Sequence, residues 1–373
     1  MRLAVDATSL IGDRTGIGTF TAEVLARLPR PDLEVAAFAV TRRGASALMD
    51  QLPPGVDARR RPMVARPLRM AWRRFDRPVI EHWTGPTDVV WGPNFVVPPT
   101  KSAAEVVTVH DLTCIHFPEM CTSDTLQVPG LLRRAIDRGA WVHTVSKAVA
   151  DDVVANLGAD PQRVVTIHNG APAPRDPSLV DRLVAEGRRQ VGCDEYLAFI
   201  GTLEPRKDVP SLIDAFDRIA EDRPSLRLVI AGPDGWGADA VSSRIATSPH
   251  RSRIIRTGWL SADRRDALLA GAAAFVYPSL LEGFGLPPLE AMSLGTPVVA
   301  TSVGSLPEVL GDAARWCTPG DPQSLAEAIL AVIDDDGCSR RLADAGRAKV
   351  SDYSWERTAD QLVDLFRRAA SGR

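Results

Sequence analysis

Short apolar segments alternate with segments of helical periodicity along most of the chain. In the first half, segments that we interpret as strands lie at 3–5, 35–40, 88–91, 106–109, 141–145 and 164–167. In the second half they lie at 196–200, 227–231, 254–257, 274–277 and 297–300. Buried strands that alternate with helices indicate parallel sheets with helices on both faces. The pattern therefore predicts an α/β protein with doubly wound parallel sheets.

A break in this pattern divides the chain into two similar halves. Residues 169–177 contain three prolines and show no periodicity, which is typical of a domain boundary. We therefore expect two Rossmann-like domains facing each other across a cleft. They are an N-terminal domain over residues 1–170 and a C-terminal domain over residues 193–352, joined by a linker at 171–192. The helical segment at 353–373 is expected to return to the N-terminal domain.

Composition excludes several classes of protein. The 373 residues are 45% hydrophobic and 24% charged, which is ordinary for a globular protein and excludes a disordered or fibrous chain. The five cysteines are odd in number, widely spaced and without a C-x-x-C pair, so they indicate neither a disulfide framework nor a zinc site. A net charge of −3 argues against a nucleic-acid partner. Because Asp6 interrupts any secretory signal and no long apolar run follows, we expect a cytoplasmic protein.

One stretch is strongly basic. Residues 59–77 contain eight arginines and a single acid, Asp76. Apolar side chains recur there with helical spacing, at Leu68, Trp72, Phe75 and Val79. A basic amphipathic helix of this kind fits peripheral contact of residues 59–79 with an anionic membrane or a lipid-linked acceptor. Packing on its own domain, with the arginines in solvent, explains the pattern equally well.

Two glutamates flank a glycine-bearing turn in the second half. Glu282 follows the predicted strand 274–277, and Glu290 lies about one turn into the helix that the prolines at 287 and 288 begin. Gly285 lets the backbone approach a ligand closely, and the helix start offers free N–H donors. Carboxylates and N–H donors together suit a polyol diphosphate such as a nucleotide sugar. The alternative is a tight turn with solvated glutamates.

Further candidates follow other predicted strands. Arg206 and Lys207 come directly after strand 196–200, where a guanidinium beside an ammonium can neutralise a diphosphate leaving group. The alternative is an exposed basic pair, although cations at a helix start oppose its dipole unless an anion is bound there. His110 ends strand 106–109 and is either an active-site residue or structural. The glycine loop at 12–18 lacks the third glycine of a dinucleotide fingerprint, because residue 21 is Thr.

Several motifs in a fixed order carry a family resemblance. They are Glu282 to Glu290, the segment Gly-Thr-Pro-Val-Val-Ala at 295–300, Pro307-Glu308, and the segments 199–208, 145–147, 15–19 and 109–112. Together they resemble the retaining GT-B glycosyltransferases of family GT4. The motifs of the N-terminal half are typical of its bacterial, mannosyltransferase-like branch. The resemblance extends over nearly the whole chain.

The resemblance implies roles for individual residues. Glu290 would hold the donor ribose, and Glu282 with the backbone amides of residues 284–286 would hold the donor sugar. As catalytic residues it implies His110, Arg206, Lys207 and Glu282. As residues that bind the nucleotide sugar it implies Gly16, Gly201, Phe284, Gly285, Leu286 and Glu290.

The function implied is retaining transfer of a hexose to a hydroxyl group of a glycan or lipid-linked acceptor. Mannose from GDP-mannose is the donor that the branch favours, and neither a metal nor another cofactor is expected. The location would be the cytoplasm or the inner face of the membrane. A UDP-sugar donor of glucose type, a sugar-nucleotide epimerase or phosphorylase, and a non-catalytic nucleotide-sugar-binding subunit stay open as alternatives. A phosphorylase would need a cofactor-bearing lysine, and Lys207 is the one lysine near the predicted site.

Overall fold

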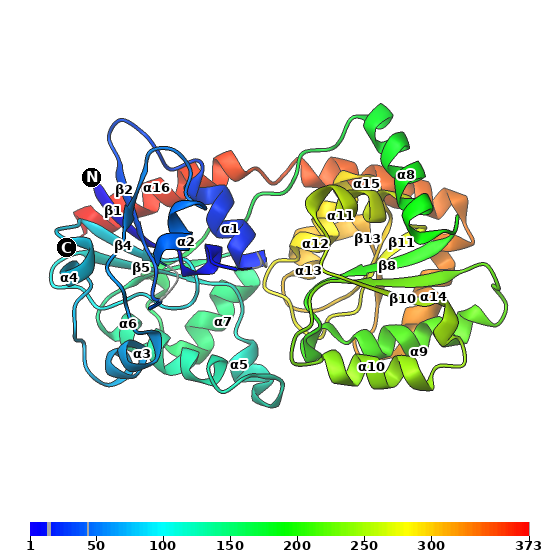
Figure 1. Ribbon diagram of the computed structural model, residues 1–373, viewed down its shortest axis with the longest axis horizontal. Helices are drawn as coiled ribbons and strands as arrows, with labels where there is room; N and C mark the ends of the chain where they lie inside the picture. Colours follow the sequence, from blue (N-terminus) through cyan, green and yellow to red (C-terminus); the bar gives the residue numbers. More distant parts are fainter. Residues whose placement is uncertain (13–15, 43–44, 373) are drawn as a thin grey trace. The chain divides into compact units, whose positions relative to one another are not determined.

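A computed structural model of the protein describes residues 1–12, 16–42 and 45–372 (Figure 1). The chain forms two compact units. The first unit comprises Met1–Gly170 and Trp355–Arg373, and the second comprises Ala171–Ser354. Each unit contains one parallel sheet with helices on both faces, so the predicted doubly wound α/β fold is confirmed.

The first unit is built on a seven-stranded sheet in the order β3-β2-β1-β4-β5-β6-β7. Its strands are β1 (Arg2–Asp6), β2 (Glu34–Phe38), β3 (Val56–Arg59), β4 (Val89–Gly92), β5 (Ala104–Val109), β6 (Trp141–Thr144) and β7 (Val164–Thr166). The apolar pattern missed β3, an edge strand in which polar residues alternate with apolar ones. The chain order reverses between β1 and β4, which makes the carboxyl ends of these strands the expected binding edge.

The C-terminal helix completes the core of the first unit. Helices α1 (Gly16–Leu25) and α16 (Trp355–Ser371) cover one face of the sheet (Figure 1). On α16, the ring of Phe366 lies 5.4 Å from that of Trp91 on β4. The remaining helices of this unit are α2 (Ala45–Met49), α3 (Ala65–Arg74), α4 (Glu81–Thr84), α5 (Thr113–His116), α6 (Val128–Asp137) and α7 (Lys147–Leu157).

The second unit repeats this plan with six parallel strands in the order β10-β9-β8-β11-β12-β13. They are β8 (Tyr196–Ile200), β9 (Arg227–Ala231), β10 (Ile254–Gly258), β11 (Ala274–Tyr277), β12 (Val298–Thr301) and β13 (Ala314–Cys317). The pattern missed β13, because the charged and exposed Arg315 interrupts its apolar run. The order reverses between β8 and β11, which pair directly. Their carboxyl ends form the topological switch point of this unit.

Helices cover both faces of the second sheet (Figure 1). They are α8 (Pro177–Val191), α9 (Val209–Ala220), α10 (Ala238–Thr247), α11 (Ala262–Gly271), α12 (Leu286–Ser293), α13 (Leu306–Leu310), α14 (Pro322–Ile333) and α15 (Asp336–Val350).

Most of the segment expected to be a linker is helical. Within 171–192, only residues 171–176 lack regular secondary structure, and the rest is α8 with its cap. The Asp176 carboxylate accepts the N–H of Ser178 and caps the helix start, at 2.9 Å. A Cβ on Gly187 would lie 2.0 Å from the carbonyl oxygen of Ala267, so α8 packs very closely on α11. Because the segment begins with a proline-rich stretch, the sequence analysis did not predict α8, which belongs to the second unit.

The basic amphipathic helix is shorter than its spacing predicts. Helix α3 ends at Arg74, and Phe75 has extended backbone, so Val79 lies beyond the helix. Leu68 and Trp72 are buried against the first unit. These two positions thus serve the core. Within the described part of the chain, no helix has the length and apolar character needed to cross a membrane.

Candidate functional site

The strongest candidate site lies at the switch point of the second unit. Arg206 and Lys207 form the short 3₁₀ turn Pro205–Lys207 soon after β8, and Glu282 lies in the loop after β11. Adjacent parallel strands end at the same edge of a sheet, so residues about 75 positions apart in the chain meet there.

Direct contacts join these three side chains. The Lys207 ammonium donates to Glu282 Oε1 at 2.6 Å, and Arg206 Nη1 donates to the same oxygen at 2.9 Å. Lys207 also donates to the hydroxyl of Tyr277 and lies 4.6 Å from the centre of its ring. Arg206 Nε donates to Glu204 at 2.9 Å. Because the Lys207 and Glu282 side chains are only 8% and 7% exposed, this is a buried charge cluster.

The cluster fixes the charge of its members. Burial alone would raise the pKa of Glu282, but the charges of Arg206 and Lys207 outweigh it and lower that pKa to about 2. Burial, followed by repulsion from Arg206, lowers the pKa of Lys207, and Glu282 opposes this shift. Burial and the nearby Glu282 charge raise the pKa of Tyr277, so its phenol stays neutral. Glu282 is therefore a carboxylate over the whole physiological pH range.

The arrangement leaves donor capacity for an anion. An ammonium has three N–H donors, and Lys207 uses two of them on Glu282 and Tyr277. With Glu204 included, two carboxylates balance two cations. The third N–H of Lys207 can therefore bind an anion directly, whereas the N–H groups that already contact Glu282 or Glu204 can do so only by giving up a carboxylate.

Glycines bring the backbone of neighbouring loops against the cluster. A Cβ on Gly304 would lie 2.3 Å from the carbonyl oxygen of Glu282, which also accepts hydrogen bonds from Ser305. A Cβ on Gly232, whose φ is +133°, would lie 2.0 Å from the carbonyl oxygen of Gly201. A Cβ on Gly201 itself would lie 3.8 Å from Cε of Lys207. Gly201 thus stands beside the lysine stem, as part of the same tightly packed edge.

Helix α12 begins directly after the loop that carries Glu282. Gly285, with φ +97°, precedes the helix, and no side chain caps it. In the described structure, the N–H groups of Gly285 and Leu286 donate to no protein acceptor, as expected for a first helical turn. The Phe284 side chain is buried, with its ring 5.4 Å from that of Tyr353. The buried ring anchors the turn, while the helix start offers N–H donors.

Glu290 forms a separate ion pair. Its Oε1 lies 3.1 Å from Nη1 of Arg265, an arginine on the neighbouring helix α11. Burial raises the pKa of Glu290, and the charge of Arg265 opposes this shift. Sequence analysis missed Arg265, because nothing distinguishes it from the adjacent Arg264. It also left Glu204 and Tyr277 without a role, although Glu204 stands two positions before Arg206 and Tyr277 ends a buried strand.

His110 belongs to the first unit, near the switch point of that sheet. Its Nε2–H donates to the carbonyl oxygen of Pro93 at 2.7 Å, which leaves Nδ1 as an acceptor. The rings of Phe20 and Phe95 lie edge-on at 5.2 Å and 5.6 Å. Burial lowers the pKa of His110, so the imidazole is neutral at pH 7. Phe95 has a φ of +58°, a strained value that often occurs at functional sites.

Gly16 also lies in the first unit, where it begins α1. A Cβ added there would meet no atom within 4 Å, so packing in the described structure does not demand glycine at this position. Residues 13–15 of the predicted glycine loop lie outside the described residues. In the described ranges, no group of three or more His, Cys, Asp or Glu side chains is placed to hold a metal ion.

Known proteins match the chain along its length. Residues 187–349 match the model for glycosyl transferases group 1, and residues 14–173 match the model for Glycosyltransferase Family 4. O-antigen chain mannosyltransferase B of Escherichia coli is 30% identical over 382 residues, which cover 95% of this chain and 96% of the relative. The serotype-specific mannosyltransferase WbdA of Escherichia coli is also 30% identical, over 62% of this chain and 29% of its own length.

Solved structures share the fold. WaaG, a glycosyltransferase involved in lipopolysaccharide biosynthesis, superposes with a TM-score of 0.75 at 16% identity, covering 98% of this chain and 99% of WaaG. HepE of Anabaena, solved with UDP and glucose, superposes with a TM-score of 0.74 at 20% identity, with the same coverage of each chain.

Proposed function

We propose that this chain, which belongs to the GT4-like family of GT-B glycosyltransferases, transfers mannose from GDP-mannose to a glycan or lipid-linked acceptor. The observation that carries this proposal is the contact of Arg206, Lys207 and Glu282 at the switch point of the second sheet. Similarity to a mannosyltransferase over nearly the full length supports mannose as the sugar. The reaction would take place in the cytoplasm, with the acceptor presented at the inner face of the membrane.

Each part of the donor has a matching group in the second unit. Arg206 and Lys207 would hold the diphosphate and stabilise the charge that develops when it leaves. Glu282 and the N–H groups at the start of α12 would hold hydroxyl groups of the sugar, with Gly201 and Phe284 shaping the surrounding backbone. Glu290 would accept from the ribose hydroxyls, with Arg265 holding its carboxylate in place.

The charge state of Glu282 supports retention by front-face substitution. A carboxylate with a pKa of about 2, bonded to two cations, is a weak base and a weak nucleophile. The leaving diphosphate would instead take the proton of the acceptor hydroxyl. The bond from the anomeric carbon to the diphosphate oxygen then breaks, and the bond to the acceptor oxygen forms on the same face of the sugar.

The first unit would supply the acceptor side. A neutral His110 offers Nδ1 as an acceptor for a sugar hydroxyl, since Pro93 holds the other ring nitrogen. Gly16 would let the start of α1 approach the phosphates or the acceptor. No metal is required in this proposal, because Arg206, Lys207 and the dipole of α12 provide the positive charge.

A glucose-type UDP-sugar donor is the second candidate. HepE, which shares the fold, was solved with UDP and glucose. The same Arg206, Lys207 and Glu282 roles would apply, since both donors contain a diphosphate. A non-catalytic subunit that binds a nucleotide sugar is the remaining alternative.

A thermal-shift panel with GDP, UDP, ADP and TDP tests the donor directly. We expect GDP to raise Tm most, because it is the nucleotide of the proposed donor. A ligand at about a hundredfold excess over its Kd stabilises the native state by about 2.7 kcal/mol. Stabilisation by UDP instead would move the donor to the glucose-type alternative. No response to any of the four nucleotides would contradict the proposed donor site.

Replacing Glu290 by alanine is expected to raise the Kd of GDP about tenfold or more, because a charged hydrogen bond to the ribose is lost. Isothermal titration of GDP into the purified variant measures this. Arg264→Ala is the matched control, since it removes a charge from the same helix next to Arg265, and its Kd should not change. An unchanged Kd in Glu290→Ala would remove Glu290 from the ribose role.

A further inference from the structure

Helix α3 carries large apolar side chains that face solvent. Seven large hydrophobic residues are exposed in the described structure, and three of them are Val64, Met70 and Phe75, at 51%, 63% and 60% exposure. They stand just before the helix, on its outer face and directly after its end. Exposed apolar side chains grouped on one element mark an interaction surface more often than isolated ones do.

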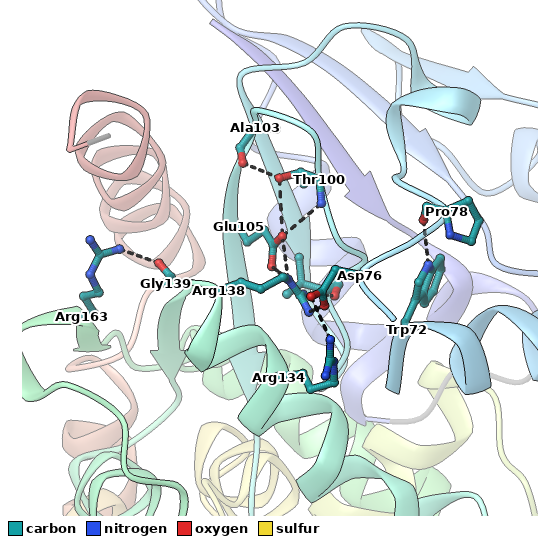
Figure 2. A network of polar contacts seen from close by, with 11 residues as sticks. Trp72, Asp76, Pro78, Thr100, Ala103, Glu105, Arg134, Arg138, Gly139 and Arg163 are labelled. Atoms are coloured by element: carbon teal, nitrogen blue, oxygen red, sulfur yellow. Dashed lines mark hydrogen bonds and ion pairs between the residues drawn. The ribbon is translucent and has the colours of Figure 1, made fainter. Parts of the chain in front are cut away.

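Of these three, only Phe75 belongs to the stripe that helical spacing singled out, and it lies beyond the last helical residue, Arg74. Leu68 and Trp72 are buried, and the Trp72 indole N–H donates to the carbonyl oxygen of Pro78 at 2.9 Å (Figure 2). Met70, midway between them in sequence, therefore projects from the opposite side of the helix. The core of the first unit does not account for the apolar character of the outer face.

Arginines lie among these apolar residues along the chain. Within 60–77, five of them are exposed and form neither an ion pair nor a side-chain hydrogen bond in the described part of the chain: Arg60, Arg66, Arg73, Arg74 and Arg77. Arg61 is also exposed, but it donates to the carbonyl oxygen of His82. We call the first five arginines, together with Val64, Met70 and Phe75, the α3 surface.

The one acid of the stretch is already neutralised. Figure 2 shows Asp76 bonded to Arg134 and Arg138 of α6 and its C-terminal end. The two distances are 2.8 Å and 3.1 Å. Arg138 in turn donates to the buried Glu105 at 2.6 Å. Asp76 therefore serves to fix the end of α3 to the unit, and it does not offset the charge of the arginines.

An open groove adjoins the end of the α3 surface. It has a volume of about 510 Å³ and is lined by Phe75, Arg77, Pro78, Val79 and His82. Most of its lining is apolar, with Arg77 beside it. A groove of this kind suits a hydrocarbon chain whose anionic headgroup meets an arginine.

We infer that the α3 surface docks the protein on an anionic lipid bilayer, with Val64, Met70 and Phe75 entering the interface and the arginines binding headgroups. Charge complementarity selects a membrane with negative lipids, and apolar side chains among arginines match a lipid interface. This inference deepens the proposed function, from which it takes only the lipid-linked acceptor. The contacts that carry it lie entirely in the first unit.

Vesicle flotation tests the inference. The wild-type protein should float with vesicles of equal parts phosphatidylcholine and phosphatidylglycerol, and should stay unbound with phosphatidylcholine alone. The triple variant Arg66→Gln/Arg73→Gln/Arg74→Gln should bind these anionic vesicles at least about tenfold more weakly than the wild type, since each arginine near the surface is worth about fivefold. The double variant Met70→Ser/Phe75→Ser should show a loss of at least about tenfold as well, because it removes apolar side chains that enter the interface. High salt should weaken binding of the wild type.

Matched controls carry equal changes elsewhere. Met49→Ser in α2 and Trp236→Ser in the second unit each remove an exposed apolar side chain, at 41% and 49% exposure, and should leave vesicle binding unchanged. Absence of wild-type binding to the anionic vesicles would overturn the inference, and so would full binding by both α3 variants. Binding of a nucleic acid or an acidic protein at the α3 surface, without vesicle binding, would assign it to a different partner.

The outcome is separable from that of the proposed function. The α3 variants should keep the wild-type response to GDP in thermal shift, because the nucleotide site lies in the second unit. Conversely, Lys207→Met should float like the wild type. Loss of vesicle binding with an intact GDP response identifies the α3 surface as the lipid contact, whatever the donor sugar proves to be.

Discussion

Replacing Lys207 by methionine will lower kcat for glycosyl transfer by about a hundredfold to a thousandfold, the usual effect of removing one group that stabilises developing charge. The ammonium is buried, it contacts Glu282 at 2.6 Å, and it has a third N–H available for the leaving phosphate. Methionine keeps the length of the stem beside Gly201 while removing the charge. Steady-state kinetics with GDP-mannose measure the effect. Without a known acceptor, the rate of donor hydrolysis is followed in place of transfer.

Two further variants show whether the loss is chemical. Lys147→Met removes an exposed lysine that pairs with Asp151, and its kcat should equal that of the wild type. Lys207→Arg keeps the charge and should retain more activity than Lys207→Met. Arg206 still bonds Glu282 in both variants, so the second unit should stay folded, which circular dichroism checks. A kcat near the wild-type value in a folded Lys207→Met protein would show that Lys207 does not stabilise the leaving group.

Replacing Glu282 by glutamine will destabilise the second unit at neutral pH, and this deficit will shrink as the pH falls. The folded-state pKa of Glu282 is about 2, below its ordinary value of 4.5, because Arg206 and Lys207 overcome the cost of burial. Its contribution to stability is therefore complete above pH 4.5 and is lost as the pH approaches 2. Between about pH 6 and about pH 3, the difference in unfolding free energy between the wild type and Glu282→Gln should narrow by roughly 2 kcal/mol.

Urea unfolding followed by tryptophan fluorescence at several pH values measures this difference. Glu290→Gln is the matched control, because burial raises the pKa of Glu290 instead of lowering it. A raised folded-state pKa means that the folded protein binds the proton more tightly than the unfolded chain. The wild type should therefore gain stability relative to Glu290→Gln as the pH falls, with the opposite sign. A pH-independent deficit in Glu282→Gln would contradict the charged cluster.

The alternation of short apolar segments with segments of helical periodicity determined the architecture of the protein. Nearly every buried strand is a short apolar run, since a parallel sheet covered on both faces needs apolar residues on both sides of each strand. The strands β8, β9 and β11 have the predicted bounds. The apolar pattern did not predict the edge strands β3 and β13, because an edge position tolerates polar residues such as Asp57 and Arg315.

The loops after β8 and β11 could be found from the sequence, because Arg206, Lys207 and Glu282 each follow an apolar strand. Tertiary structure decided which residues meet. It joined these three in one buried cluster and added Tyr277, yet placed Glu290 in a separate pair with Arg265. Such pairings depend on strand order and helix packing, and neither is encoded in local spacing.

The basic stretch at 59–77 shows most clearly what the sequence determined and what the tertiary structure decided. By itself, the sequence determined that residues 59–77 are cationic and amphipathic. Only the tertiary structure decided that Leu68 and Trp72 face the core, that Asp76 is bonded to α6, and that Met70 faces solvent. Helical periodicity locates an apolar face, but whether a face is covered depends on what the rest of the chain packs against it. Burial is a property of the folded unit, and residue spacing carries no record of it.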